Sequence, residues 1–76
     1  PNPSRDVFNV SFISEQEQQL RVKIVNIVGE EVYSEDLQMF EGEYFKTIDL
    51  KQYSKAVYFL EIETDKGVIN KKLILQ

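Results

Sequence analysis

Residues 57–64 read Val57-Tyr58-Phe59-Leu60-Glu61-Ile62-Glu63-Thr64, and this octapeptide decides the class of fold. Its apolar residues at positions 58, 60 and 62 share one face of an extended chain, and the glutamates at 61 and 63 share the other. A period of two is typical of a half-buried β-strand. The segment therefore predicts a strand with one face in a core and one in solvent.

The same alternation recurs along the rest of the chain, and no segment shows helical periodicity. We predict five further strands, at Arg5–Ile13, Gln19–Ile27, Glu31–Leu37, Glu43–Leu50 and Val68–Leu75. The three glycines, Gly29, Gly42 and Gly67, fall between or beside these segments, where a turn with φ above zero favours glycine. Short strands at intervals of roughly ten residues predict an all-β sandwich or barrel.

Two of the segments that connect the predicted strands differ from simple turns. Ser14-Glu15-Gln16-Glu17 matches a helix capping box, but no apolar helical stripe follows it, so a polar hairpin loop is favoured over a helix. The stretch from Lys51 to Lys55 is longer and is expected to carry the chain from one sheet to the other.

Composition excludes several classes of function. The chain has 76 residues, enough for a single domain, with a net charge of −4 that disfavours a nucleic-acid binder. It holds neither cysteine nor histidine, which removes disulfides, thiolate metal sites and the usual general base. No apolar run is long enough to span a membrane as a helix. We expect no catalytic residues, no metal site and no cofactor.

Three groups of residues are candidate sites. Glu61 and Glu63 resemble a carboxylate pair, but a solvated outer face is the favoured interpretation. The aromatic residues fit either a sugar-stacking platform or the core, and the core is favoured because a small sandwich needs large side chains to fill it. Lys71-Lys72 is the only adjacent basic pair, and strand alternation predicts that its two side chains point to opposite faces.

Taken in order, these features resemble a known family. The chain opens Pro1-Asn2-Pro3 and continues with Asn26-Ile27-Val28-Gly29; Gly42 precedes Ile48-Asp49-Leu50, Tyr58 lies in the strongest strand, and Gly67 precedes Lys71-Lys72. This series is similar to the type A C-terminal sorting domain of the type IX (Por) secretion system of Bacteroidetes-type bacteria, over essentially the whole chain. Ala56 departs from it, because a glycine is common there, and so does Lys51-Gln52-Tyr53.

The resemblance implies an immunoglobulin-like antiparallel β-sandwich of about seven short strands. It also implies that residues 1–76 are the sorting domain of a larger secreted cargo, from which a chain opening on Pro1 has been excised. The domain would direct that cargo through the periplasm and outer membrane, to be secreted or held at the cell surface. A sortase-like peptidase would then remove it by cleaving upstream of Pro1. Its partners are the translocon and that peptidase.

Recognition after folding requires a rigid patch, and Gly29, Lys71 and Lys72 are the residues we predict for it. Deleting residues 71–76 is expected to abolish export. An alternative function is a carbohydrate-binding or spacer module of a secreted hydrolase, which predicts an exposed row of aromatic residues. Exposed edge strands also predict weak self-association.

Overall fold

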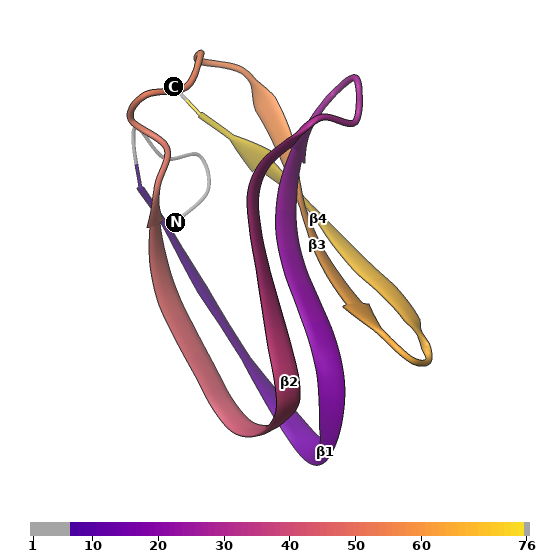
Figure 1. Cartoon of the computed structure of the whole chain (residues 1–76). Helices are drawn as coiled ribbons and strands as arrows, with labels where there is room; N and C mark the ends of the chain where they lie inside the picture. The colour runs from indigo at the N-terminus through magenta and orange to yellow at the C-terminus, as the bar shows by residue number, and fades with distance from the viewer. Residues whose placement is uncertain (1–6, 76) are drawn as a thin grey trace.

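A computed structural model describes residues 7–75 of the chain, and within this range the protein is all-β (Figure 1). It has four strands, β1 (Val7–Asn26), β2 (Glu31–Asp49), β3 (Val57–Thr64) and β4 (Gly67–Ile74). They form one antiparallel sheet in the order β2-β1-β3-β4. The all-β antiparallel prediction is confirmed.

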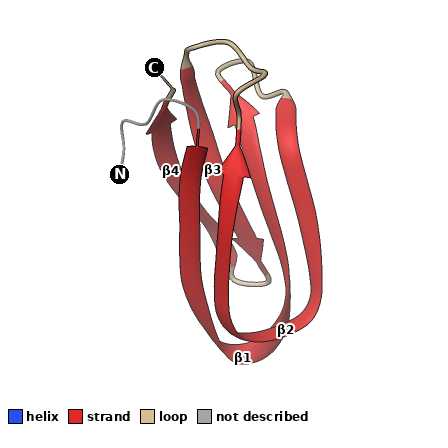
Figure 2. Ribbon diagram, turned by 90° about the vertical axis from the view of Figure 1, so that its left-hand side faces the viewer, coloured by secondary structure: helices blue, strands red, loops and turns tan. Residues whose placement is uncertain are grey.

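The two long strands fold back on themselves, so the single sheet makes two layers. Figures 1 and 2 both show β1 and β2 turning back together at the lower end of the molecule. On one side of the bend, Val7–Ser14 pairs with Gly42–Asp49; on the other, Gln18–Val25 pairs with Glu31–Phe40. β3 then pairs with Arg21–Asn26 only, and β4 pairs with β3. A two-stranded layer therefore lies over a four-stranded one.

The bend lies where the β1–β2 ladder loses its register. The register shifts between Ser14 and Gln18. Opposite this break, Met39 has φ of 52° and Gly42 has φ of 106°, both in the left-handed region. Irregularities of this kind interrupt a ladder and bend the strand that carries them. The bend thus depends on local backbone geometry in both strands.

The predicted hairpin loop at residues 14–17 is wrong, because these residues lie within a strand, and the described residues form four strands, which does not confirm the seven that the resemblance implies. The segments Arg5–Ile13 and Gln19–Ile27 fall in one strand, β1, and Glu31–Leu37 and Glu43–Leu50 both fall in β2. Ser14 Oγ donates to the Gln16 carbonyl at 2.6 Å and accepts from Gln18 Nε2 at 2.9 Å. These local bonds satisfy polar groups while the backbone stays extended, so the chain bends without forming a helix or a closed turn.

The core lies between the two layers and is built from the faces that alternation predicts. Val22 and Ile24 on β1 are fully buried, and Tyr58, Leu60 and Ile62 on β3 are at most 7 % exposed. Phe8 and Val10 reach the same cluster from the other layer. Burying an aliphatic or aromatic side chain contributes roughly 1.5–3 kcal/mol, so this cluster is the main source of stability.

Aromatic residues fill the core at the bend, as the favoured interpretation predicted. Phe12 stacks on Tyr44 with ring centroids 4.7 Å apart, and Phe40 meets both rings edge-on at 6.2 and 6.0 Å. Offset and edge-to-face pairs of this kind add about 0.5–1.5 kcal/mol beyond their burial. Phe45, at 65 % exposed, is the described aromatic residue that departs furthest from this pattern.

The connection after β2 carries the chain from the folded-over layer to β3. Leu50 is 1 % exposed and anchors it, while Asp49 Oδ1 accepts from the Lys51 amide at 2.8 Å. Tyr53 donates its hydroxyl to the Val32 carbonyl at 3.1 Å. Ala56 is not among the residues with positive φ, so this turn does not need the glycine common in the family.

Candidate recognition surface

Gly29 lies in the turn between β1 and β2, and the turn is held by Asn26. The Asn26 side-chain oxygen accepts from the amides of Val28 and Glu30 at 3.1 and 2.9 Å, and its amide group donates to Glu30 Oε1 at 2.8 Å. The backbone of Asn26 adds two more bonds, to Glu30 and Gly29, each 3.0 Å. Gly29 has φ of 86°, which a residue with a side chain adopts only with strain. The turn is therefore rigid.

This turn presents two apolar side chains to solvent. Ile27 and Val28 are each 75 % exposed. Sequence reasoning selected Asn26 and Gly29 but missed this pair, because alternation places Ile27 at the end of a strand and says nothing of a turn. A tight turn with two branched aliphatic residues outside it is the signal that points to them.

Lys71 and Lys72 lie on β4 and point to opposite faces of the sheet, as alternation predicted. Lys71 shares its face with Leu73 and lines a groove between β4 and the first half of β1. Lys72 lies on the outer face, in register with Phe59. The pair is therefore not one basic patch, and the two lysines face different surroundings.

The structure brings the turn and β4 to the same end of the sheet. Val25, just before the turn, is in register with Phe59, which is in register with Lys72. One strand, β3, separates Val25 from Lys72, so these two residues are about 10 Å apart at the usual strand spacing. The three predicted recognition residues therefore share one end of the molecule without forming a single contact surface.

Most of the other residues on which the family resemblance rests lie in turns or in the core. Pro1, Asn2 and Pro3 lie outside the described residues. Gly42 and Gly67 have φ of 106° and 141° at the bend and at the β3–β4 turn. Tyr58 is buried and donates its hydroxyl to the Ser54 carbonyl at 2.7 Å, and Asp49 caps the turn after β2. The described residues of this group therefore form turns or fill the core.

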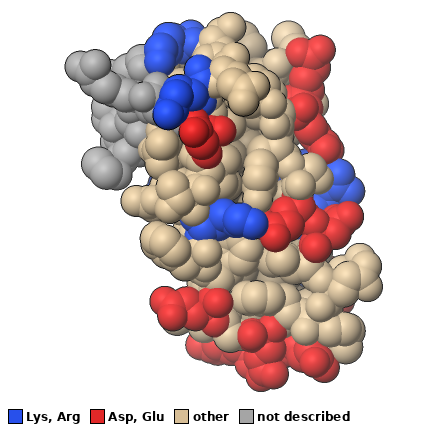
Figure 3. Space-filling view, turned by 60° about the vertical axis from the view of Figure 1, so that its left-hand side comes forward, with Lys and Arg blue, Asp and Glu red and all other residues tan. Residues whose placement is uncertain are grey.

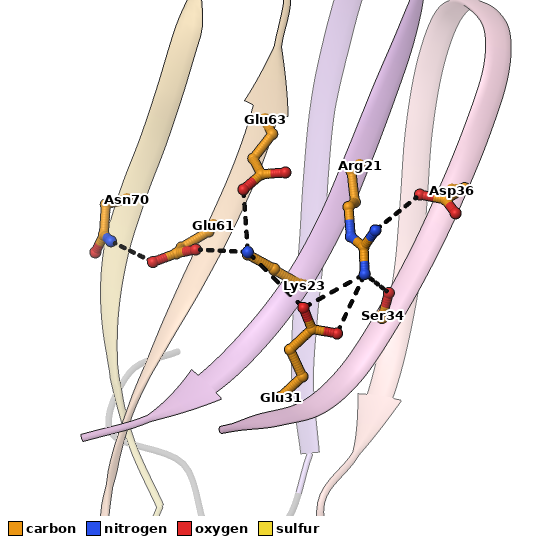
Figure 4. A network of polar contacts seen from close by, with 8 residues as sticks. All are labelled: Arg21, Lys23, Glu31, Ser34, Asp36, Glu61, Glu63 and Asn70. Carbon is orange, nitrogen blue, oxygen red and sulfur yellow. Dashed lines mark hydrogen bonds and ion pairs between the residues drawn. The ribbon is translucent and has the colours of Figure 1, made fainter. Parts of the chain in front are cut away.

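A network of ion pairs covers the outer face of the four-stranded layer (Figure 4). Lys23 lies among three carboxylates, those of Glu63 at 3.0 Å, Glu61 at 3.6 Å and Glu31 at 3.8 Å. The hydrogen bond that Lys23 donates to Glu63 raises the pKa of Lys23 above its ordinary value of 10.5. Arg21 pairs with Glu31 and Asp36. Glu61 and Glu63 are thus both paired with Lys23 across strands.

Charge is unevenly distributed over the molecule. Glu15, Glu17, Glu41 and Glu43 are exposed at or beside the bend. Figure 3 shows acidic side chains gathered at that lower end. No group of three acidic residues in the described range is arranged to hold a metal ion.

The fold and this surface define a small all-β domain whose distinctive residues make turns, core and exposed patches rather than a reaction centre. A comparison with protein-family models matches residues 1–76 to the secretion system C-terminal sorting domain, and the chain belongs to that family. No curated protein matches, and no solved structure matches.

The family establishes what the domain does. It is the C-terminal sorting signal of the type IX secretion system, and the family is not catalytic. It marks proteins that cross the outer membrane to the cell surface or are secreted, and it interacts with the secretion machinery. No helix in residues 7–75 is long and apolar enough to cross a membrane.

Proposed function

We propose that the whole chain is the removable sorting domain of a larger cargo protein and that the secretion machinery reads its folded surface. The observation that carries this proposal is the burial of the last strand region, where Leu73 is 4 % and Leu75 is 2 % exposed. Side chains this deep in the core are not available to a receptor that reads a linear tail. The signal is then the surface that the folded domain presents.

The finer parts of the proposal extend the family function. The domain has no enzymatic activity of its own, and a sortase-like peptidase releases it by cutting upstream of Pro1. The face-to-face packing of two layers supports an immunoglobulin-like sandwich in which the bent β1 and β2 take the place of four shorter strands. The Gly29 turn, Lys71 and Lys72 are the recognition residues.

A fusion assay tests the proposal. Residues 1–76 with their native upstream linker are attached to a periplasmic reporter and expressed in a bacterium with a type IX system and in a mutant lacking the translocon. We expect reporter at the surface, shortened by the mass of the domain, only when the translocon is present. A stable, folded fusion that stays in the periplasm contradicts the proposal and favours a carbohydrate-binding or spacer module, to be followed by a polysaccharide screen.

Point variants locate the recognition surface better than truncation does. Deleting residues 71–76 removes Leu73 and Leu75 and so unfolds the core as well as removing the lysines. Lys71→Ala and Lys72→Ala leave both leucines in place. We expect at least one of the two to lower surface yield while its melting temperature stays within a few degrees of wild type. Wild-type yield from both variants would remove the lysines from the recognition surface.

A further inference from the structure

The two layers of the domain have unequal widths, and this leaves one side open. The first half of β1, Phe8–Ser14, pairs with β2 on one side and with none of the described residues on the other. Within the described residues, β4 pairs with β3. The segment Phe8–Ser14 therefore carries a row of backbone N–H and C=O groups on an edge that no described strand covers.

A groove runs between this open edge of β1 and the facing layer formed by β3 and β4. It has a volume of about 330 Å³ and is lined by Phe8, Val10 and Phe12 from β1 and by Leu60, Ile62 and Ile69 from the facing layer. Ile69 is 63 % exposed although it lies on the same face of β4 as the buried Leu73. The inner face of β4 is thus covered by β1 near its C-terminal end and uncovered near Ile69.

Among the described residues that line the groove, one carries a positive charge and none carries a negative charge. Lys71 lines it beside Ile69. None of the ion pairs formed within residues 7–75 involves Lys71. Neither of the strand segments that border the groove, 7–14 and 67–74, contains an aspartate or glutamate. A cation beside an apolar groove favours a ligand that combines apolar side chains with a carboxylate.

We propose that this groove binds an extended segment of a partner protein, which adds to the free edge of β1 as a strand. Its alternate apolar side chains cover Ile62 and Ile69, and an aspartate or glutamate of the segment pairs with Lys71. Backbone hydrogen bonds to Phe8–Ser14 supply affinity, and the groove supplies specificity, as in other cases of strand addition. The relevance of this docking to export rests on the proposed function, whereas the docking itself does not.

A second copy of the chain fits the groove less well. Pairing of β4 with β4 of another copy brings the lysines of both strands together, which is unfavourable. Pairing through residues 7–14 supplies no carboxylate to Lys71. The occupant is therefore a different protein whose strand carries an acidic residue.

A charge-swap experiment on the 76-residue chain tests this inference. The probes are two nine-residue peptides of alternating valine and threonine, one with a central glutamate and one with a central lysine. Binding is followed by shifts of backbone amide signals in NMR. We expect the glutamate peptide to shift amides of residues 8–14 and 67–73, and Lys71→Glu to weaken it about fivefold and reverse the preference. Lys51→Glu, at an exposed lysine that follows β2 and does not line the groove, is the matched control and keeps the wild-type preference.

Several outcomes overturn the inference. These are shifts centred on the free edge of β2, equal binding of the two peptides, or no binding at millimolar peptide. Shifts of the groove amides that depend on protein concentration without peptide would assign the groove to a second copy instead. Each of these results leaves the fusion assay for sorting unaffected, so failure of the docking is distinguishable from failure of the proposed function.

Discussion

The two sides of the sheet differ in the charges that their edge strands carry. β2 forms one side, and it carries six carboxylates, namely Glu31, Glu35, Asp36, Glu41, Glu43 and Asp49. The other side is formed by residues 7–14 of β1 and by β4, and these segments carry none. Charged side chains on an edge strand discourage pairing with another chain. The β2 side is therefore protected against strand addition, whereas Phe8–Ser14 of β1 is left available for it.

Carboxylates on the β2 side also hold the fold together. Glu35 accepts from the hydroxyls of Tyr44 at 2.7 Å and Tyr33 at 3.1 Å, and it pairs with Lys46 at 3.4 Å. Burial raises the pKa of Tyr44, so its hydroxyl stays protonated and remains a donor. These contacts join the two halves of β2 across the bend, whereas Lys71 makes no ion pair within the described chain.

The largest effect is expected from a change that disrupts both sides together. Ile24 lies on the central strand between them and has no exposed surface. Ile24→Ala removes buried methyl groups and leaves a cavity, so it should lower the free energy of unfolding by about 2–5 kcal/mol. Urea denaturation followed by circular dichroism measures this. Ile69→Ala, on the exposed β4 position, is the control and should change stability by less than about 0.5 kcal/mol.

A smaller effect is expected at the turn that joins the central strand to the acidic one. Asn26→Ala removes three side-chain hydrogen bonds, two from the backbone amides of Val28 and Glu30 and one to the Glu30 carboxylate. We expect a loss of about 1–2 kcal/mol, since the freed groups regain water. Thermal denaturation checks this. Ile27→Ala in the same turn, where the side chain is 75 % exposed, should leave the melting temperature nearly unchanged; equal losses from both variants would contradict the role given to Asn26.

The acidic side should also make stability depend on pH. The hydrogen bond from Tyr44 holds the pKa of Glu35 below its ordinary value of 4.5. A carboxylate whose pKa is lower in the folded state stabilises the fold above its unfolded pKa, and that contribution is lost as pH falls through the folded value. The free energy of unfolding should therefore decrease below about pH 4.5. Urea titrations at pH 7 and pH 3 should show a smaller decrease for Glu35→Gln than for wild type.

The control for this pH effect is Glu41→Gln, which removes an exposed charge at the bend without touching the Tyr44 hydroxyl. It should leave the pH dependence close to that of wild type. A Glu35→Gln protein that loses stability on acidification as steeply as wild type would show that other groups carry the effect.

The smallest effect on stability is expected from single charges added to either free edge. Ile69→Glu and Gln38→Glu each place one carboxylate at an exposed strand position, on the open side and on the β2 side. Neither side chain supports the core, so each variant should stay within about 0.5 kcal/mol of wild type. A melting temperature lowered by more than a few degrees in either would show that the position is not a free surface.

The sequence predicted the class of fold and nearly every buried face, because alternation reports directly on which side of a strand meets the core. Tyr58, Leu60 and Ile62 are examples. It did not predict that two pairs of segments are continuous, because the polar run at residues 14–18 and the glycine at position 42 are as typical of a loop as of a bend within a strand. Sequence periodicity did not predict the open groove either. The groove arises because the two layers have unequal widths, and local periodicity does not show which distant segments pair.

The most direct test of the difference between the two sides is export of a reporter fused to Ile69→Glu or to Gln38→Glu, measured as surface yield in a host with a type IX system. Both proteins carry the same added charge. If a partner strand docks on the open side during export, Ile69→Glu lowers surface yield several-fold, because its carboxylate neutralises Lys71 and repels an acidic strand. Gln38→Glu is then exported as well as wild type. Equal yields from the two folded variants, or a loss confined to Gln38→Glu, would contradict it.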